Sequence, residues 1–478
     1  DAPTFDRGLG ERSRDAVVSQ VFISAAHKSS GKTLVSTGLC AAYRRRGMRV
    51  AAFKKGPDYI DPAWLTKASG NSCWNLDFFT MNQEEILTCF KAQRQDADVT
   101  VVEGNKGLFD GLDVEGSDSN AALAVTLGLP VLLVIDVTGI TRGIAPLLAG
   151  YTEFDPEVRI AGVILNRVAG PRQESKLRAA IERYSDLPVL GAIGRDPRLV
   201  IEERHLGLVP GNEDPEAFAG IEKIADVIEA TVDLDAVLAL TGRQQDSEPV
   251  AVSAPATRAI EKGRPVRIGI ARDRAFGFYY PDDLDAFANA GAELVPFNTL
   301  EDERLPQVDG LFIGGGFPEC FLEELSANVS LREDIRMFIE NGGPGYAECG
   351  GLMYLSRSIA WQGSDFPMVG VIAGDTKVSN RPVGRGYMQF RAMPNHPWPQ
   401  VRATSGRTYN VHEFHYSSLE MIDSPLTTVY SVDRGHGLDG TRDGIRVHNL
   451  LATYAHQRHV VANPWVNAFV DFARTLQG

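Results

Sequence analysis

Short runs of apolar residues, many of them β-branched, alternate with helix-like segments along the first half of the chain. Residues 21–24 form such a run and end in a loop of small residues, and residues 33–46 then have the apolar spacing of a helix. Continuous apolar strands that alternate with helices predict a parallel sheet covered on both faces. Further runs of strand length, each followed by Gly, Pro, Asp or Asn, are 50–53, 99–102, 131–135 and 160–165.

The alternating pattern is lost at residues 244–265. Their sequence, QQDSEPVAVSAPATRAIEKGRP, is polar, rich in Pro and Ala, and without periodicity, which is typical of a linker. A second α/β series begins at residues 266–270, with further strands at 310–313 and near 343–348. We therefore predict an α/β protein of two domains, residues 19–243 and 266–478, joined by the linker 244–265.

The length agrees with two domains, because a single core rarely grows beyond about 250–300 residues and the chain has 478. Its 62 acidic and 48 basic residues give a net charge of −14, which argues against a nucleic-acid partner or a membrane-surface binder. The five cysteines are odd in number and lack CxxC spacing, which favours free thiols in a reducing compartment. No apolar stretch approaches the roughly 20 residues of a membrane span, and residues 1–18 contain no signal-peptide core. We expect a cytoplasmic protein.

A phosphate-binding loop follows the first predicted strand. The sequence AHKSSGKT, residues 26–33, is a Walker A motif with Ala in place of its first Gly, and it opens a helix. Backbone N–H groups of Ser29, Ser30 and Gly31 would surround the phosphates of ATP. Lys32 would reach the β- and γ-phosphates, and the Thr33 hydroxyl would bind Mg²⁺.

Carboxylates follow two further strands. Asp58 and Asp61 lie in FKKGPDYIDP at the end of the second strand, where open α/β sheets bind ligands, although Pro-Asp and Asp-Pro also favour plain turns. Glu103 ends the strand before GNKGLFDG, which is the Walker B position. Asn166 ends a later strand, where its amide would either pair with an adenine edge or cap a turn.

The second half contains a candidate nucleophile. In GYAECGGLM, Cys349 stands among small residues where a strand turns into a helix, which is the nucleophile elbow in its thiol form. Backbone N–H groups of Gly350 and of the earlier glycine loop, Gly315 and Gly316, would form an oxyanion hole. A thiol nucleophile needs a base, and the candidates are His412, His415, His456 and His459.

The combination of SSGKT, FKKGPDYIDP, NLDFFTM, EGNKGLFDG, GVILNRV and RHLGLVP resembles the cobyrinate/hydrogenobyrinate a,c-diamide synthases, which are relatives of dethiobiotin synthetase. The likeness runs from about residue 20 to the C-terminus. It implies a P-loop ATPase domain followed by a triad-type, class I glutamine amidotransferase domain. The implied reaction is ATP-dependent formation of an acyl phosphate on an acetate side chain of a tetrapyrrole, followed by attack of glutamine-derived ammonia.

The same resemblance implies roles for particular residues. Asp58, Asp61, Glu103 and Asp110 would serve Mg²⁺ and substrate turnover, with Thr33, Asp58 and Glu103 as metal ligands. Lys55 would join the nucleotide-binding residues.

In the second half, the family base follows a Tyr in a C-terminal segment, which matches His456 after Tyr454. The departure from the family pattern in HQRH, residues 456–459, keeps His459 as a second candidate. No Glu follows two residues after either His, so a complete Cys-His-Glu triad is not readable from the sequence. The segment HEFHYS, residues 412–417, would lie at the rim of the site or at the domain interface.

Several alternatives stay open at this point. A P-loop ATPase switch of the partition or nitrogenase-iron-protein type would share the first half, and a glutamine-dependent ligase would share both halves while acting on a non-tetrapyrrole acid. Within the tetrapyrroles, cobyrinate, siroheme and nickel-sirohydrochlorin all remain candidates. The order of amidation, the oligomeric state (a homodimer is one option) and the path of ammonia are open as well.

Overall fold

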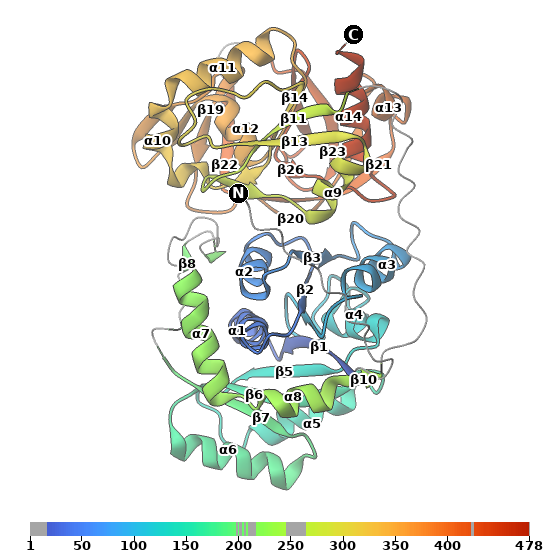
Figure 1. The fold of residues 1–478 in the computed structure, drawn as a ribbon, viewed down its shortest axis with the longest axis vertical. Helices are drawn as coiled ribbons and strands as arrows, with labels where there is room; N and C mark the ends of the chain where they lie inside the picture. Colours follow the sequence, from blue (N-terminus) through green and yellow to red (C-terminus); the bar gives the residue numbers. More distant parts are fainter. Residues whose placement is uncertain are drawn as a thin grey trace, which may run out of the picture.

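The computed structural model describes residues 17–196, 199, 203–204, 207–208, 217–244, 264–421 and 425–477. Its two halves each have a sheet of their own, one above the other in Figure 1. The first sheet runs from Val17 to Gln244 and the second from Val266 to His456. The domain boundaries 19–243 and 266–478 remain a prediction, and residues 245–263 of the predicted linker lie outside the described part.

The first half is built on a parallel sheet, and each predicted strand of this half is present. The strand order is β3-β2-β4-β1-β5-β6-β7, with β10 antiparallel to β1 at its start. The C-terminal ends of β2, β4 and β1 therefore lie side by side at one edge, which faces the second half. In sequence order the strands are β1 (Val17–Ala25), β2 (Val50–Lys55), β3 (Cys73–Leu76), β4 (Val99–Glu103), β5 (Val131–Asp136), β6 (Ile160–Val168), β7 (Val189–Gly194) and β10 (Gly242–Gln244).

Helices cover both faces of this sheet, as the continuous apolar strands predict. Successive strand residues point to opposite faces, so Val21 and Ile23 pack with one helical layer and Phe22 packs with the other. One layer comprises α1 (Lys32–Arg45), α2 (Ile60–Ser69), α7 (Ala217–Thr231) and α8 (Leu234–Thr241). The other comprises α3 (Gln83–Gln93), α4 (Asn120–Leu127), α5 (Ile144–Phe154) and α6 (Pro171–Tyr184).

The second half has a ten-stranded mixed sheet in the order β13-β11-β14-β16-β25-β24-β23-β20-β21-β26. The first five strands are parallel, as expected from the α/β pattern, and the remaining five pair antiparallel. The sequence analysis did not identify the antiparallel part. The strands are β11 (Val266–Ala271), β13 (Ala292–Phe297), β14 (Gly310–Ile313), β16 (Gly345–Glu348), β20 (Gly384–Ala392), β21 (Thr408–His415), β23 (Thr428–Arg434), β24 (Arg442–Val447), β25 (Leu450–Thr453) and β26 (Ala455–His456).

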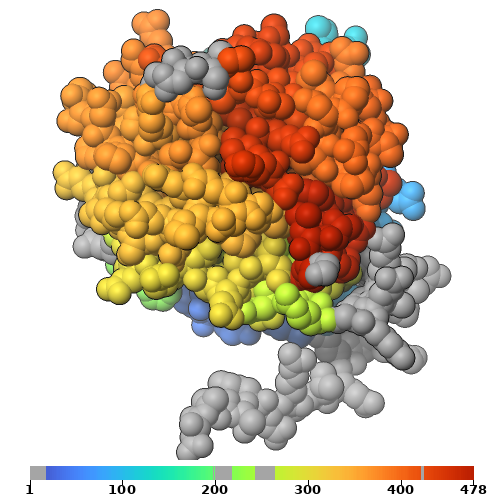
Figure 2. Space-filling view, turned by 90° about the horizontal axis from the view of Figure 1, so that it is seen from above, coloured from blue at the N-terminus to red at the C-terminus, as the bar shows by residue number. Residues whose placement is uncertain are grey.

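Two apolar clusters hold helices on opposite faces of this second sheet. Residues of α9 (Pro281–Asn289), α13 (Pro399–Ala403) and α14 (Trp465–Thr475) belong to one cluster. Residues of α10 (Leu322–Ala327), α11 (Val329–Glu340) and α12 (Gly350–Leu355) belong to the other. Figure 2 looks down on this half, whose residues cover nearly all of that face.

Smaller sheets and short elements complete the fold. A two-stranded ribbon pairs β12 with β15, and a four-stranded sheet has the order β18-β17-β19-β22. Their bounds, with the short strands β8 and β9 of the first half and the 3₁₀ turn η2, are β12 (Phe276–Phe278), β15 (Gly315–Gly316), β17 (Ser356–Trp361), β18 (Ser364–Pro367), β19 (Ile372–Val378), β22 (Ser417–Met421), β8 (Glu203–Arg204), β9 (Gly207–Leu208) and η2 (Pro318–Cys320).

All five cysteines are free, as the sequence predicts. Within the described part of the chain, no helix is both long and apolar enough to cross a membrane.

Candidate active sites

The loop between β1 and α1 has the conformation of an anion-binding turn. Gly31 precedes the first helical residue with φ 100°, and a Cβ there would lie 2.1 Å from the amide nitrogen of Asn166, so the position requires glycine. The hydroxyl of Ser30 donates to the carbonyl of His27 over 2.8 Å, while Ser29 has a positive φ of 63°. The start of α1 therefore presents backbone N–H groups on a tightly held loop, as phosphate binding requires.

Asn166, at the end of β6, supports this loop. Its Nδ2 donates to the carbonyl of Ser30 over 2.8 Å, and its Oδ1 accepts from the backbone N–H of Arg167 over 2.9 Å. Both ends of the amide are thus engaged by the backbone. The predicted contact with an adenine edge remains a prediction.

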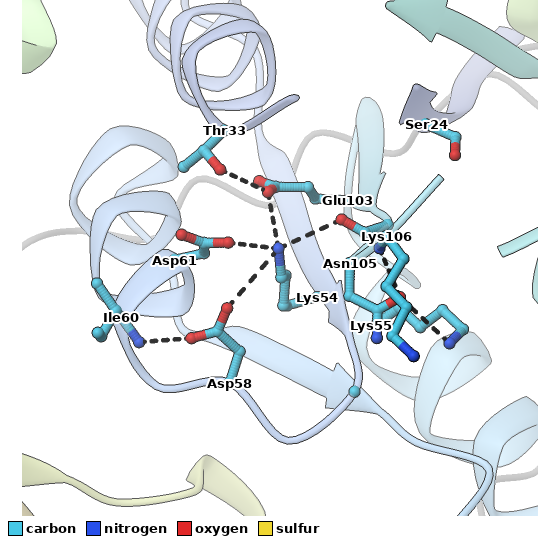
Figure 3. A network of polar contacts seen from close by, with 12 residues as sticks. Ser24, Thr33, Lys54, Lys55, Asp58, Ile60, Asp61, Glu103, Asn105 and Lys106 are labelled. Atoms are coloured by element: carbon cyan, nitrogen blue, oxygen red, sulfur yellow. Dashed lines mark hydrogen bonds and ion pairs between the residues drawn. The ribbon is translucent and has the colours of Figure 1, made fainter. Parts of the chain in front are cut away.

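A cluster of charged side chains lies at the ends of β2 and β4, with Lys54 at its centre (Figure 3). We call Lys54, Asp58, Asp61 and Glu103 the Lys54 cluster. The Lys54 ammonium donates to Asp61 and to Glu103, the latter over 2.8 Å, and lies 3.8 Å from Asp58. The Thr33 hydroxyl donates to the same oxygen of Glu103 over 2.9 Å. The structure thus brings together the predicted residues Thr33, Asp58, Asp61 and Glu103.

Burial sets the electrostatics of this cluster. Burial raises the pKa of Asp58 to about 7, with help from Asp61 and against the attraction of Lys54. Burial likewise raises the pKa of Glu103, with Lys54 opposing. For Asp61, burial acts to raise the pKa, but Lys54 outweighs it and the pKa is lowered. Lys54 itself is desolvated, yet Asp61 and Glu103 raise its pKa, so the lysine stays charged.

Lys32 is the second buried cation at this edge. Burial and the charge of Lys54 together lower its pKa to about 8, with Glu103 opposing them. Two positive side chains therefore lie close to the loop that would receive a polyphosphate. Electrostatic attraction of this kind is strongest where water is excluded.

Lys54 was missed by the sequence analysis, which selected its neighbour Lys55. The two residues are successive in β2, so their side chains point to opposite faces of the sheet. Lys55 instead donates to Asn105 over 3.4 Å. The pairing of β2 with β4 places Lys54 directly beside Glu103, and this pairing cannot be read from the sequence of β2 alone.

Asp110, also predicted here, occupies the next loop and is absent from the Lys54 cluster. Its Oδ2 accepts from the backbone N–H of Gly107 over 3.1 Å, which closes a turn. That turn touches the start of the phosphate-binding loop, because a Cβ on Gly107 would lie 2.9 Å from the carbonyl oxygen of Ala26. A role of Asp110 in turnover remains a prediction.

The second site is a strained strand-to-helix turn. Cys349 lies between β16 and α12 with φ 47° and ψ −102°, and its Sγ is 3.5 Å from the carbonyl oxygen of Phe414. A left-handed φ at a non-glycine residue is a strained conformation that clusters at active sites. A small, partly open pocket adjoins the thiol, and its lining includes Gly316, Phe317 and His415. The HEFHYS segment thus reaches the rim of the site, as predicted.

The predicted oxyanion glycines are close to this turn. A Cβ on Gly350 would lie 3.0 Å from the backbone nitrogen of Gly316 and 2.9 Å from its carbonyl oxygen. A Cβ on Gly315 would lie 2.4 Å from the His456 ring. The glycine loop and the elbow therefore approach each other backbone to backbone. Their N–H groups as an oxyanion hole remain a prediction.

Of the candidate bases, His456 is the histidine whose pKa is raised by Cys349. Burial alone lowers the pKa of His456, but interactions with Cys349 and Glu348 outweigh it and raise the pKa to about 10. Burial lowers the pKa of His459 to about 4, and its backbone N–H donates to Asp283 over 2.6 Å. Burial lowers the pKa of His412 to about 3. The close approach of the His456 ring to Gly315 of the glycine loop agrees with its interaction with Cys349, and His456 as the base remains a prediction.

The two sites meet across the interface between the halves. Tyr59, next to Asp58, stacks on Phe278 with ring centroids 5.2 Å apart and lies 5.1 Å from the His456 ring. Arg458 donates to the carbonyl of Asn75 over 2.6 Å. The side chain of Asn75 in turn donates to the carbonyl of Asp58 over 2.8 Å. The loop that carries the first site is thus tied to the segment that carries the candidate base.

Comparison with known families agrees with two complementary sites. Residues 22–209 match the model of the CobQ/CobB/MinD/ParA nucleotide binding domain. Residues 267–463 match the CobB/CobQ-like glutamine amidotransferase domain. The first match contains the phosphate-binding loop and the Lys54 cluster, and the second contains Cys349 and His456.

Relatives that carry both halves are similar over nearly the whole chain. A cobyrinate a,c-diamide synthase of Magnetococcus marinus is 47% identical over 96% of this chain and 97% of its own length. One from Methanosarcina acetivorans is 39% identical over 95% of each chain. One from Listeria innocua is 38% identical over 94% of this chain and 97% of its own.

Proposed function

The chain belongs to the family of cobyrinate a,c-diamide synthases, and from that premise we propose that it amidates the a and c acetate side chains of cobyrinate. It is a glutamine-hydrolysing, amide-forming ligase with a nucleotide-binding domain. The observation that supports the proposal most is that one chain carries both a phosphate-binding loop and a thiol nucleophile. Tyr59, from the half with the loop, contacts Phe278 and His456 of the half with the thiol. A regulatory ATPase switch would not need a glutamine amidotransferase domain such as the second half.

The chemistry begins at the first site. A carboxylate oxygen of the substrate attacks the γ-phosphorus of ATP, the bond to ADP breaks, and an acyl phosphate forms. Ammonia then attacks the acyl carbon, loses a proton, and phosphate leaves with one oxygen of the original carboxylate. Lys32 and the backbone N–H groups of the loop would neutralise charge on the phosphates during the first step.

Mg²⁺ would accompany ATP, and the residues present suit it. No group of three His, Cys, Asp or Glu side chains in the described segments is arranged to hold a metal alone. Mg²⁺, however, commonly binds one or two carboxylates together with substrate phosphates. Glu103 Oε2 is buried without a hydrogen-bond partner, next to the Thr33 hydroxyl. We propose Thr33 and Glu103 as its protein ligands, with Asp58 nearby; the ion would add positive charge at the phosphates.

The second site would supply the ammonia. Cys349 would attack the side-chain amide carbon of glutamine while its proton passes to His456, which would then protonate the departing ammonia. Water would hydrolyse the resulting glutamyl thioester, releasing glutamate and the free thiol. Backbone N–H groups of Gly316 and Gly350 would stabilise the oxyanion.

We further propose that the enzyme is cytoplasmic, where thiols stay reduced, and that a homodimer is the assembly to test by light scattering.

Isotope transfer tests the ligase chemistry. Cobyrinate labelled with ¹⁸O in its carboxylates, incubated with ATP and glutamine, should release inorganic phosphate that carries one ¹⁸O per amide formed. Lys32→Ala should abolish that transfer. Phosphate without label, released at a rate indifferent to the tetrapyrrole, would overturn the proposal.

Mass spectrometry of the products tests the substrate. We expect a two-step mass change with cobyrinate, one step for each carboxylate converted to an amide, and no change with siroheme. The relatives' names motivate cobyrinate. Amidation of siroheme in preference to cobyrinate would keep the chemistry and replace the substrate.

A further inference from the structure

The second half lacks the Glu that would complete a Cys-His-Glu triad two residues after the candidate base His456. Position 458 is Arg, and its Nε donates to Asp282 over 2.7 Å at the interface between the halves. A carboxylate approaches His456 from another direction. Glu348, the residue that precedes Cys349, has its Oε2 3.6 Å from His456 Nδ1. Both side chains are almost fully buried, with 2% and 1% exposed.

The position of this carboxylate is fixed by its other oxygen. Glu348 Oε1 accepts from the Tyr346 hydroxyl over 2.6 Å and from the backbone N–H of Gln457 over 2.8 Å. The side chain of Gln457 donates to Tyr346 over 2.9 Å and accepts from Asn463 over 3.1 Å. A buried network of this kind holds a side chain in one orientation.

The sheet supplies the same arrangement at the level of the backbone. Glu348 ends β16 and lies opposite Thr453 of β25 in the parallel pairing. The chain continues from β25 through one residue to β26, which ends at His456. The last residue of β16 and the base are therefore brought together by strand register and not by a mobile loop.

We propose that Glu348 is the positioning residue of the glutaminase site, orienting His456 through Nδ1 so that Nε2 faces Cys349. This inference rests on the proposed function of the second half. At 3.6 Å the carboxylate lies at ion-pair distance from Nδ1, where it stabilises the imidazolium that forms when the thiol loses its proton. Here the carboxylate comes from the residue before the nucleophile.

Few other groups near His456 could carry out this task. Cys349 is its reaction partner, and Tyr59 packs on its ring. His412, whose ring centroid is 6.1 Å away, has a pKa lowered to about 3 by burial and so adds no charge near neutrality. Glu348 is the carboxylate that the structure pairs with the base.

The test uses Glu348→Gln, which keeps size and most hydrogen bonds and removes the charge. We expect kcat for glutamine hydrolysis to fall by about tenfold or more, with KM unchanged. Hydrolysis in the unmodified enzyme should decline as pH rises through about 10, where His456 loses its proton. In Glu348→Gln that decline should move down by about one to three pH units, because an attractive charge has been removed.

Two further variants separate positioning from structure. Glu348→Asp retains the charge, so its alkaline decline should stay nearer that of the unmodified enzyme. Glu413→Gln is a matched control, because Glu413 is also 2% exposed and also lies 3.6 Å from a histidine, His415. It should leave the alkaline decline in place.

Amide formation from added ammonia distinguishes this inference from the function itself. It should be retained in Glu348→Gln, and its absence in the unmodified protein would sink the ligase proposal instead. An unshifted alkaline decline in Glu348→Gln, or an equal shift in Glu413→Gln, would overturn the role of Glu348.

Discussion

The two candidate sites use their carboxylates in opposite ways. At the first site, Asp58, Asp61 and Glu103 share one lysine, Lys54, so acids outnumber the cation that holds them. At the second site, one acid, Glu348, faces one histidine.

The two sites should therefore respond differently when one charged side chain is removed. A lysine with a raised pKa cannot be removed without leaving the buried Glu103 and the partly buried Asp61 and Asp58 unpaired, and breaking a buried ion pair costs about 3–5 kcal/mol. A histidine that loses its carboxylate can release a proton and become neutral. The first site therefore links charge to stability, whereas the second links charge to proton transfer.

The largest effect is expected at the second site. Cys349→Ser should lower glutamine-dependent amidation by more than about a thousandfold, because removal of a nucleophile eliminates covalent catalysis. Amidation from added ammonia should be retained, since the first site is untouched. Glutamine hydrolysis by the mutant at the unmodified rate would show that another residue is the nucleophile.

His456→Ala should follow, with a loss of about 10²–10⁴-fold in glutamine hydrolysis, the usual range for general acid–base catalysis. His459→Ala is the matched control, because it lies three residues away in the same segment and should change the rate little. Steady-state release of glutamate measures both. A reversed order of the two losses would assign the base to His459.

Lys54→Met extends the comparison to stability. Removal of the cation should lower the free energy of unfolding by about 3 kcal/mol and abolish amide formation from either nitrogen source. Lys55→Met, the next residue of the same strand, is expected to lower stability much less, because Lys55 makes one long hydrogen bond to Asn105. Denaturant unfolding of both variants measures the difference, and equal losses would contradict the central role of Lys54.

The sequence predicted much of both sites because their local parts are contiguous. The phosphate-binding loop and the elbow at Cys349 each follow from a strand, a glycine and a helix in succession. Lys54 and Glu348 escaped prediction for a physical reason. Each acquires its partner through the register of parallel strands, Lys54 beside Glu103 and Glu348 opposite Thr453, and strand order is not written in a single run of residues. The antiparallel part of the second sheet was missed in the same way.

Tyr59 offers a final way to sharpen the comparison, because it belongs to both sites. It follows Asp58 in the chain, while its ring lies 4.5 Å from that of Tyr280 and 5.1 Å from that of His456. A shift of the loop on ATP or substrate binding would therefore press directly on the base. If the sites communicate through this contact, the rate of glutamine hydrolysis should depend on occupancy of the first site.

We expect Tyr59→Leu to weaken that dependence while leaving each half-reaction active. Mutations along coupling networks change the coupling by about 0.5–2 kcal/mol, or roughly 2- to 30-fold in rate ratios. The measurement is the ratio of glutamine hydrolysed to amide formed, with and without ATP and cobyrinate. Tyr59→Phe preserves the ring and serves as the control, so its ratio should match that of the unmodified enzyme. If this ratio is the same in Tyr59→Leu as in Tyr59→Phe, the aromatic contact holds the halves together but does not couple the activities of their sites.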